Sequence, residues 1–162
     1  KFMEMRRKDR EITNINEIHN IIHKARILHL GMFDGEYPYI VPLHYGYSFN
    51  EDKLIFYMHG AKSGKKYELI NINPSVFIEI ETDIALVSGG DIACKYGSAY
   101  ASIMARGKAS IVEAVDEKIA GLNLLMQHQT GKTFNINNQM ALSVNVIKVE
   151  AFDITAKSRP LI

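Results

Sequence analysis

The sequence predicts a mainly β protein with a few short helices, folded as a small antiparallel β-barrel. Segments rich in β-branched and aromatic residues recur along the chain, and turn signals separate them. Asp34-Gly35 is typical of a hairpin turn, because glycine adopts positive φ without steric cost, and Asn50-Glu51-Asp52 marks a second turn. Three segments have the character of helices. Five or six strands joined mostly by hairpins favour a barrel.

Six segments have the composition of strands, some with alternating apolar residues. They cover residues 26–33, 36–49, 53–60, 75–88, 99–114 and 141–155. The second of these contains Pro38 and Pro42, which have no backbone N–H to donate. We therefore expect that strand to lie at an edge of the sheet or to contain a bulge.

The expected helices are bounded by recognisable start and stop residues. They cover residues 14–24, 63–73 and 116–130. Asn14, Ser63 and Asp116 are the expected caps, because their side chains can accept hydrogen bonds from free N–H groups. Pro74 ends the second helix by disfavouring helical backbone before it, and Gly131 follows the third.

The 162 residues are expected to form a single domain, residues 1–162. The formal net charge is +1, so nothing draws the chain as a whole toward nucleic acid or an anionic membrane. Cys94 is the only cysteine, which rules out an internal disulfide and a cysteine-clustered zinc site. The first twelve residues lack the apolar stretch of a signal peptide, and no apolar run is long enough to span a membrane. We expect a cytoplasmic protein.

The segment HGAKSGKK, residues 59–66, is typical of a phosphate site. Gly60 and Gly64 let backbone approach a ligand, a helix start exposes free N–H groups, and Lys65 and Lys66 add positive charge. It is not a Walker A loop, because its glycines are one residue too close and Lys66 replaces the magnesium-binding hydroxyl. The pattern alone favours phosphate binding and a solvated helix start equally.

Two other groups have the spacing of ligand sites but favour plainer interpretations. His19 and His23 lie four apart on a helix, yet the glutamate of an HExxH motif is missing, which favours a polar helical face. Glu79, Glu81 and Asp83 are predicted to share one face of a strand. They could form an acidic cluster, but a solvated sheet face is the better interpretation.

His44 and His59 are expected to face one region if the strands of residues 36–49 and 53–60 pair as a hairpin. The alternative is two half-buried histidines with backbone partners. Cys94 lies beside Lys95, which could lower its thiol pKa. With no histidine base assigned to it, we interpret Cys94 as a spectator.

Five segments, in their order and spacing, extend across nearly the whole chain. They read MRRKDREIT, YIVPLHYGY, LIFYMHGAKSGKKYELINxNP, YASIMARGKASIV and FDITAKSRP. Together they resemble the flavin-binding split barrels of the pyridoxamine 5'-phosphate oxidase superfamily, and within it the nitroimidazole-resistance (Nim) proteins. The resemblance implies a six-stranded antiparallel split β-barrel that binds FMN.

The resemblance also implies a homodimer with FMN in the clefts between subunits. The flavin ring would be lined by Val41, Pro42, Leu43 and His44. The FMN phosphate would be held by Lys65 and Lys66, with His59 and Ser63 close by. Further contacts would come from Tyr100 and Ser102 of the partner subunit. No metal is implied. FMN needs no Walker loop, because two lysines, a hydroxyl and a helix start suffice for a monophosphate.

The activity implied is that of an FMN-dependent oxidoreductase of small molecules, extending to the reduction of nitro groups. His44 would orient or protonate the bound oxidant. No GxGxxG follows a strand, so an NAD(P)H donor would visit the open face of the flavin. The chain has no tryptophan and no match to the longer C-terminal part of the true oxidases, which argues against pyridoxamine phosphate as substrate.

Two alternatives are not enzymes. A split barrel can serve as a flavin- or haem-binding module, with His44, His59 or His128 as axial ligand. A barrel with several lysines and tyrosines can also bind single-stranded nucleic acid, although the near-neutral charge argues against this.

Overall fold

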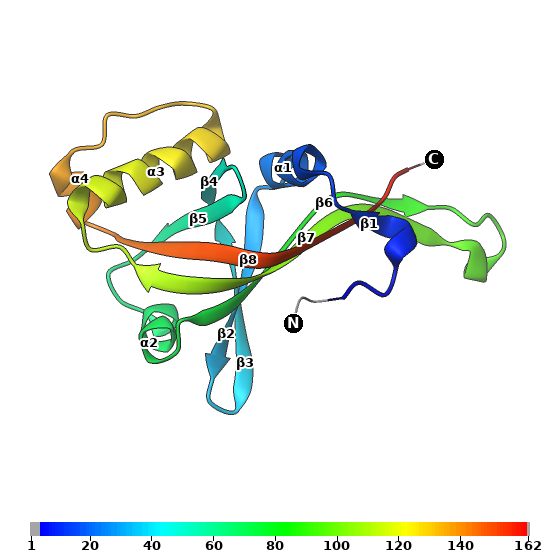
Figure 1. Cartoon of the computed structure of the whole chain (residues 1–162), viewed down its shortest axis with the longest axis horizontal. Helices are drawn as coiled ribbons and strands as arrows, with labels where there is room; N and C mark the ends of the chain where they lie inside the picture. The colour runs from blue at the N-terminus through cyan, green and yellow to red at the C-terminus, as the bar shows by residue number, and fades with distance from the viewer. Residues whose placement is uncertain (1–3, 162) are drawn as a thin grey trace.

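The computed structural model describes residues 4–161, and one antiparallel sheet curls around most of the core (Figure 1). The strands are β1 (Glu11–Ile12), β2 (Ile27–Asp34), β3 (Tyr37–His44), β4 (Gly46–Asn50), β5 (Lys53–Gly60), β6 (Ser75–Val87), β7 (Gly97–Ile111) and β8 (Asn145–Arg159). The helices are α1 (Ile15–Lys24), α2 (Lys65–Ile72), α3 (Val115–Thr130) and α4 (Asn138–Leu142), with short 3-10 turns η1 (Lys8–Arg10) and η2 (Ala93–Lys95). The mainly β prediction is confirmed.

The sheet is split rather than closed. Its strands run in the order β3-β2-β6-β7-β8-β5-β4, and β1 pairs with β8 outside this path. β3 and β4 lie at the two ends of the path and do not pair with each other. The described residues form eight strands, so the predicted number of six is wrong. The two extra strands are the two-residue β1 and the separate β4.

Residues 36–49, predicted as one strand, form β3 and β4 with a break at Tyr45. Tyr45 is fully buried, and its hydroxyl donates to the carbonyls of Ile22 at 2.6 Å and Ala25 at 3.0 Å. This anchor at the end of α1 fixes where the chain passes from one end of the sheet to the other. β3 pairs only with β2, so Pro38 and Pro42 lie on an edge strand as predicted.

Two clusters of buried apolar side chains hold the fold together. The larger fills the barrel, and the helix α1 contributes Ile18, Ile21 and Ile22 to it. The smaller lies beneath α3, which packs on β4, β5 and β8 (Figure 1). Gly46 permits this close packing, because a Cβ there would collide with the α3 backbone at Leu124 and Leu125.

Helix starts divide into those with a side-chain cap and those without one. Asn14 caps α1 as predicted, its side chain accepting from the N–H groups of Asn16 at 2.9 Å and Glu17 at 3.3 Å. The predicted Ser63 cap is wrong. Gly64 occupies that position with φ 150°, and no side chain caps α2.

The third helix also starts differently from the prediction. Ala114 precedes α3, and Asp116 lies inside its first turn, where its charge still favours the helix dipole. Gly131 ends α3 with φ 73°, as expected. The short α4, capped by Asn137, was missed and takes the first residues of the predicted last strand.

β6 and β7 extend beyond the barrel as a two-stranded arm (Figure 1). A register shift between Thr82 and Ala85, with Asp83 at φ 57°, marks the base of the arm. Asp83 pairs with Lys24 at 3.1 Å. The predicted shared face of Glu79, Glu81 and Asp83 is therefore wrong for Asp83, because the bulge interrupts the alternation.

Residues 1–3 and 162 belong to the expected domain but lie outside the described residues. Within residues 4–161, none of the helices combines the length and apolar character needed to cross a membrane.

Candidate functional site

The residues predicted to line a flavin alternate along β3. Val41 and Leu43 pack against the barrel core, whereas Pro42 and His44 are exposed on the opposite side. We call that side the outer face: the surface of β3, β2, β6 and β7 that carries Pro42, His29, Glu79 and Ser102. Pro42 is paired with His29, and His29 with Glu79, so these three lie in one row across the strands.

His44 and His59 lie close enough to influence each other. The pKa of His59 is lowered, chiefly by partial burial of its ring and further by the neighbouring His44 and the Lys66 ammonium. Part of the His59 side chain remains exposed to solvent. A neutral imidazole at His59 is therefore favoured at neutral pH. His44 ends β3 and His59 lies next to the end of β5, and these two strands contact each other although they are not hydrogen-bonded neighbours in the sheet.

Lys65 begins α2 and forms an ion pair with Asp34 at the tip of the β2–β3 hairpin. Its ammonium also lies 4.9 Å from the centroid of the Tyr39 ring. The hydrogen bond to Asp34 raises the pKa of Lys65. This lysine joins the hairpin to the glycine-lysine segment and already has a carboxylate partner.

Lys66 has no carboxylate partner among the described residues. Its ammonium lies 4.6 Å from the centroid of the Tyr67 ring. The Tyr67 hydroxyl is buried and makes no hydrogen bond. A Cβ at Gly60 would collide with this hydroxyl and approach Lys66 Nζ to 3.0 Å. Because Gly60 has no side chain, there is room beside it for both the Tyr67 hydroxyl and the Lys66 ammonium. We call Gly60, Lys66 and the Tyr67 hydroxyl the cradle, because a hydroxyl donor and an ammonium side by side can bind an anion.

Ser63 is exposed just before this cradle, and no hydrogen bond of its hydroxyl is found in residues 4–161. The first N–H groups of α2 have no side-chain cap. They are available to a ligand, as the glycine-lysine pattern predicted.

Tyr100 and Ser102 share the outer face of β7, two strands away from β2. The Tyr100 hydroxyl accepts from Arg10 Nη1 at 3.3 Å, and Lys157 Nζ lies 5.8 Å from its ring centroid. Within one chain, β2 and β6 separate both residues from His44. Their role as contacts from a partner subunit stays a prediction.

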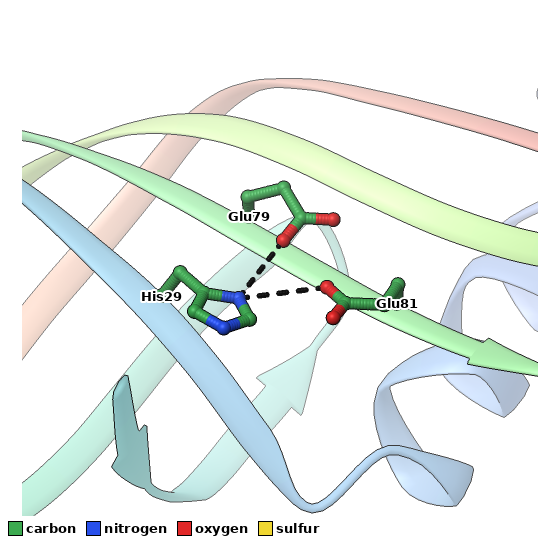
Figure 2. Close-up of side chains that lie close together, drawn as sticks. All are labelled: His29, Glu79 and Glu81. Carbon is green, nitrogen blue, oxygen red and sulfur yellow. Dashed lines mark hydrogen bonds and ion pairs between the residues drawn. The ribbon is translucent and has the colours of Figure 1, made fainter. Parts of the chain in front are cut away.

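A cluster that the sequence analysis did not assemble lies on the outer face (Figure 2). His29 Nδ1 lies 3.0 Å from Glu79 Oε2 and 3.5 Å from Glu81 Oε2. Burial and the adjacent Glu81 carboxylate raise the pKa of Glu79 to about 7. Glu79 and Glu81 were interpreted as a solvated face, because the order of the strands, which places His29 beside them, is not visible in sequence.

A cavity of about 660 Å³ opens on the same face. His29 and Glu79 lie on its wall, and Arg106 is also in the lining. Its apolar lining includes Phe33, Tyr37, Ile40, Phe77 and Phe152, each of them an exposed large side chain. Exposed apolar surface of this kind is typical of a surface that another molecule covers.

The remaining histidines have structural partners. His19 Nε2 and His23 Nδ1 each lie 3.1 Å from the Tyr47 hydroxyl, which agrees with a polar helical face rather than a metal pair. His128 is buried against Tyr45, with ring centroids 4.8 Å apart, and its Nε2 bonds the Ala25 carbonyl at 2.7 Å. His128 is therefore unsuited to be the axial ligand of the haem alternative, which leaves His44 and His59 as its candidates.

Comparison with known families agrees with this fold. The profile of the pyridoxamine 5'-phosphate oxidase family matches residues 14–158, and the chain belongs to that family. A candidate 5-nitroimidazole antibiotic resistance protein from Bacteroides thetaiotaomicron is 31% identical in sequence. The match covers 91% of this chain and 86% of that one, with a TM-score of 0.77.

Two more distant structures share the fold alone. The flavocytochrome Anf3 from Azotobacter vinelandii is 14% identical, covering 99% of this chain and 74% of that one, with a TM-score of 0.79. The FAD and haem binding protein from Mycobacterium smegmatis is 12% identical, covering 92% and 73%, with a TM-score of 0.76. No protein of curated function matches the sequence.

Proposed function

We propose that the chain is one FMN-binding domain that works as a cytoplasmic homodimer and passes electrons to small-molecule acceptors. The observation that carries this proposal is the anion cradle of Gly60, Lys66 and the unbonded Tyr67 hydroxyl, at an uncapped helix start. Lys65 would add a second positive charge after leaving Asp34. This donor set matches a phosphate monoester dianion.

The flavin ring would lie along β3, against Val41, Pro42, Leu43 and His44, with His59 and Ser63 near its phosphate. FMN, when bound, supplies two-electron redox chemistry. The chain's own residues bind it, orient it and exclude water. The exposed apolar side chains around the cavity support an interface between two copies, which would bring in Tyr100 and Ser102 of the partner subunit.

Nitro compounds are the substrate class we favour, because the 31% identical relative is a candidate 5-nitroimidazole resistance protein. Two electrons and two protons convert a nitro group to a nitroso group and water. A hydride donor of the NAD(P)H class would supply the electrons. His44, which is exposed at the end of β3, would deliver a proton to the acceptor.

The test begins with an absorption spectrum of protein purified without added cofactor, followed by identification of what acid releases. We expect a flavin spectrum and released FMN, and then NAD(P)H-dependent reduction of a nitroimidazole. A protein that is colourless and takes up no added FMN would contradict the proposal.

One alternative keeps a specific basis. Two structures of the same fold are a flavocytochrome and an FAD and haem binding protein, and exposed His44 and His59 are free of strong hydrogen bonds in the described chain. A Soret band with no flavin absorbance would favour a haem-binding module. Bound flavin without turnover of any acceptor would favour a non-catalytic flavin module.

A further inference from the structure

We propose that His29, Glu79 and Glu81 form a binding site for a first-row divalent cation, with Zn²⁺ as its best probe (Figure 2). His29 Nδ1 and one carboxylate oxygen from each glutamate all lie within 4.8 Å of one another. This cluster shares no residue with the lysine-bearing cradle, so metal binding to the cofactor-free protein tests it apart from the flavin.

The strand register builds the cluster. His29 of β2 and Glu79 of β6 are direct cross-strand partners, and Glu81 follows two residues later on the same face. Paired strands hold side chains more firmly than loops do, and a rigid frame favours a metal site. The three ligand atoms thus come from two adjacent strands with their backbones fixed by the sheet.

The distances agree with metal coordination. Zinc binds imidazole nitrogen and carboxylate oxygen at about 2.0–2.2 Å, so two ligands in a tetrahedral site lie roughly 3.3 Å apart. The Nδ1 atom of His29 lies 3.0 Å from Glu79 Oε2 and 3.5 Å from Glu81 Oε2. A cation could be bound by His29 Nδ1 and both carboxylates with little movement of the side chains.

A second observation points to a missing ligand. Within residues 4–161, the Oε2 atom of Glu81 is buried and accepts no hydrogen bond, and the His29 Nδ1 atom lies 3.5 Å from it. A buried carboxylate oxygen without a donor is costly, because it has lost water and gained no partner. Figure 2 shows both carboxylates directed toward the same ring nitrogen. A cation between them would satisfy this oxygen.

Charge in the cluster favours the same conclusion. Within residues 4–161, no lysine or arginine pairs with Glu79 or Glu81, and both carboxylates lie against the His29 ring. When both carboxylates are ionised, the cluster carries a net charge of −1 or −2, which a divalent cation neutralises. The mixed nitrogen and oxygen ligands favour Zn²⁺ or another first-row ion over Mg²⁺ and Ca²⁺.

The site opens to solvent in a single chain, and in a homodimer that covers this face it would lie at the subunit interface. His29 and Glu79 both line the 660 Å³ cavity on the outer face, and all three side chains are partly exposed. Three protein ligands leave a coordination position for water or for a small molecule in that cavity.

The test is calorimetric titration of EDTA-treated protein with Zn²⁺. It uses a Cys94→Ser background, because the exposed thiol of Cys94 is a competing zinc ligand. We expect one Zn²⁺ per chain, both with and without added FMN. We expect each of the variants His29→Gln, Glu79→Gln and Glu81→Gln to weaken zinc binding by about tenfold or more. Replacing even a residue that only hydrogen-bonds a metal ligand typically lowers metal affinity by about tenfold.

His23→Gln is the matched control, because it removes a histidine from the other pair that could attract zinc, on α1. It should leave the affinity unchanged. Thermal melting without metal should show that the three ligand variants fold. Zinc binding that survives all three ligand variants, or that is lost only with His23→Gln, would overturn the proposal, as would the absence of zinc binding in the parent protein.

Discussion

Lys65, the first residue of α2, is paired with Asp34 at the tip of the β2–β3 hairpin. The same lysine is the predicted partner of the FMN phosphate. Its carboxylate partner would compete with the phosphate for the ammonium.

This competition can be measured. Asp34→Asn frees Lys65 and should tighten FMN binding several-fold, whereas Lys65→Ala should weaken it by roughly tenfold, because a charged hydrogen bond is lost. Quenching of FMN fluorescence gives both dissociation constants. Lys53→Ala, which breaks an exposed pair with Glu150 on a different part of the sheet, is the control and should change nothing. If neither Asp34→Asn nor Lys65→Ala alters the affinity, Lys65 does not bind the phosphate.

The Tyr67 hydroxyl should show opposite effects on stability and on binding. Tyr67→Phe removes a buried donor without a partner and should leave the cofactor-free protein as stable as the parent, or more stable by up to about 1 kcal/mol. The same variant should weaken FMN binding by about tenfold, since the hydroxyl is aimed into the cradle. Urea unfolding and FMN titration measure the two effects. A loss of stability with unchanged FMN affinity would assign the hydroxyl to the fold alone.

His44 is the predicted catalytic residue. His44→Ala should leave FMN bound, because the lysines, Tyr67 and the backbone of β3 hold it, and should reduce nitro-group turnover by at least about 100-fold through loss of the proton donor. Steady-state kinetics at saturating FMN measure the loss of turnover. Unchanged turnover would remove this role from His44.

His128 should make the protein less stable in mild acid. The pKa of the His128 ring is lowered, chiefly by burial and further by the nearby Arg26 and His23. The hydrogen bond to the Ala25 carbonyl acts in the opposite direction but is the smaller effect. The folded state therefore favours neutral His128. Its contribution to stability is present above about pH 6.5, the unfolded value, and is lost as the pH falls toward the lower folded pKa.

Glu79, whose pKa is raised to about 7, stabilises the folded state as the pH falls from 7.5 to 5.5, whereas His128 lowers the free energy of unfolding over this range by on the order of 1 kcal/mol. His59, whose pKa is also lowered, contributes in the same direction. An NMR titration of the His128 ring separates the two, and its midpoint should lie below that of an unfolded chain. A midpoint at or above about 6.5 would contradict the prediction.

Gly46 should tolerate no side chain. Gly46→Ala places a methyl group against the backbone of α3 at Leu124 and Leu125, so the helix must move, at a cost of about 3 kcal/mol or more. Gly31→Ala is the control, because a Cβ there meets Phe77 only at ordinary contact distances of 3.5 and 3.7 Å. Thermal melting should show a large loss for the first variant and little change for the second. Equal melting temperatures would mean that α3 packs less closely than described.

Local chemistry made much of the fold predictable. Asn14 has a capping side chain, Pro38 and Pro42 lack the N–H that an inner strand requires, and Gly131 adopts positive φ easily. Each of these properties belongs to one residue. They could be interpreted without knowledge of the rest of the chain.

What could not be predicted depends on contacts between distant segments. The break at Tyr45 exists because its hydroxyl reaches two carbonyls at the end of α1. His29 joins Glu79 and Glu81 only because β2 pairs with β6, fifty residues away in the case of Glu79. The start of α2 at Gly64 has no side-chain signal at all. In the cradle, the sequence pattern predicted the positive charges. The buried position of the Tyr67 hydroxyl depends on packing and could not be predicted.

The arm of β6 and β7 has a consequence for how this fold can vary in evolution. Ala85–Val87 pairs with Gly97–Ala99, while β8 begins its pairing with β7 only at Tyr100. Insertions or deletions in the arm therefore alter only the pairing of β6 with β7, in a part of these strands that β8 does not pair with. With the bulge at Asp83 separating the two registers, the arm can lengthen or shorten among descendants of this sequence while the strands that carry His29, Glu79 and Ser102 keep their alignment.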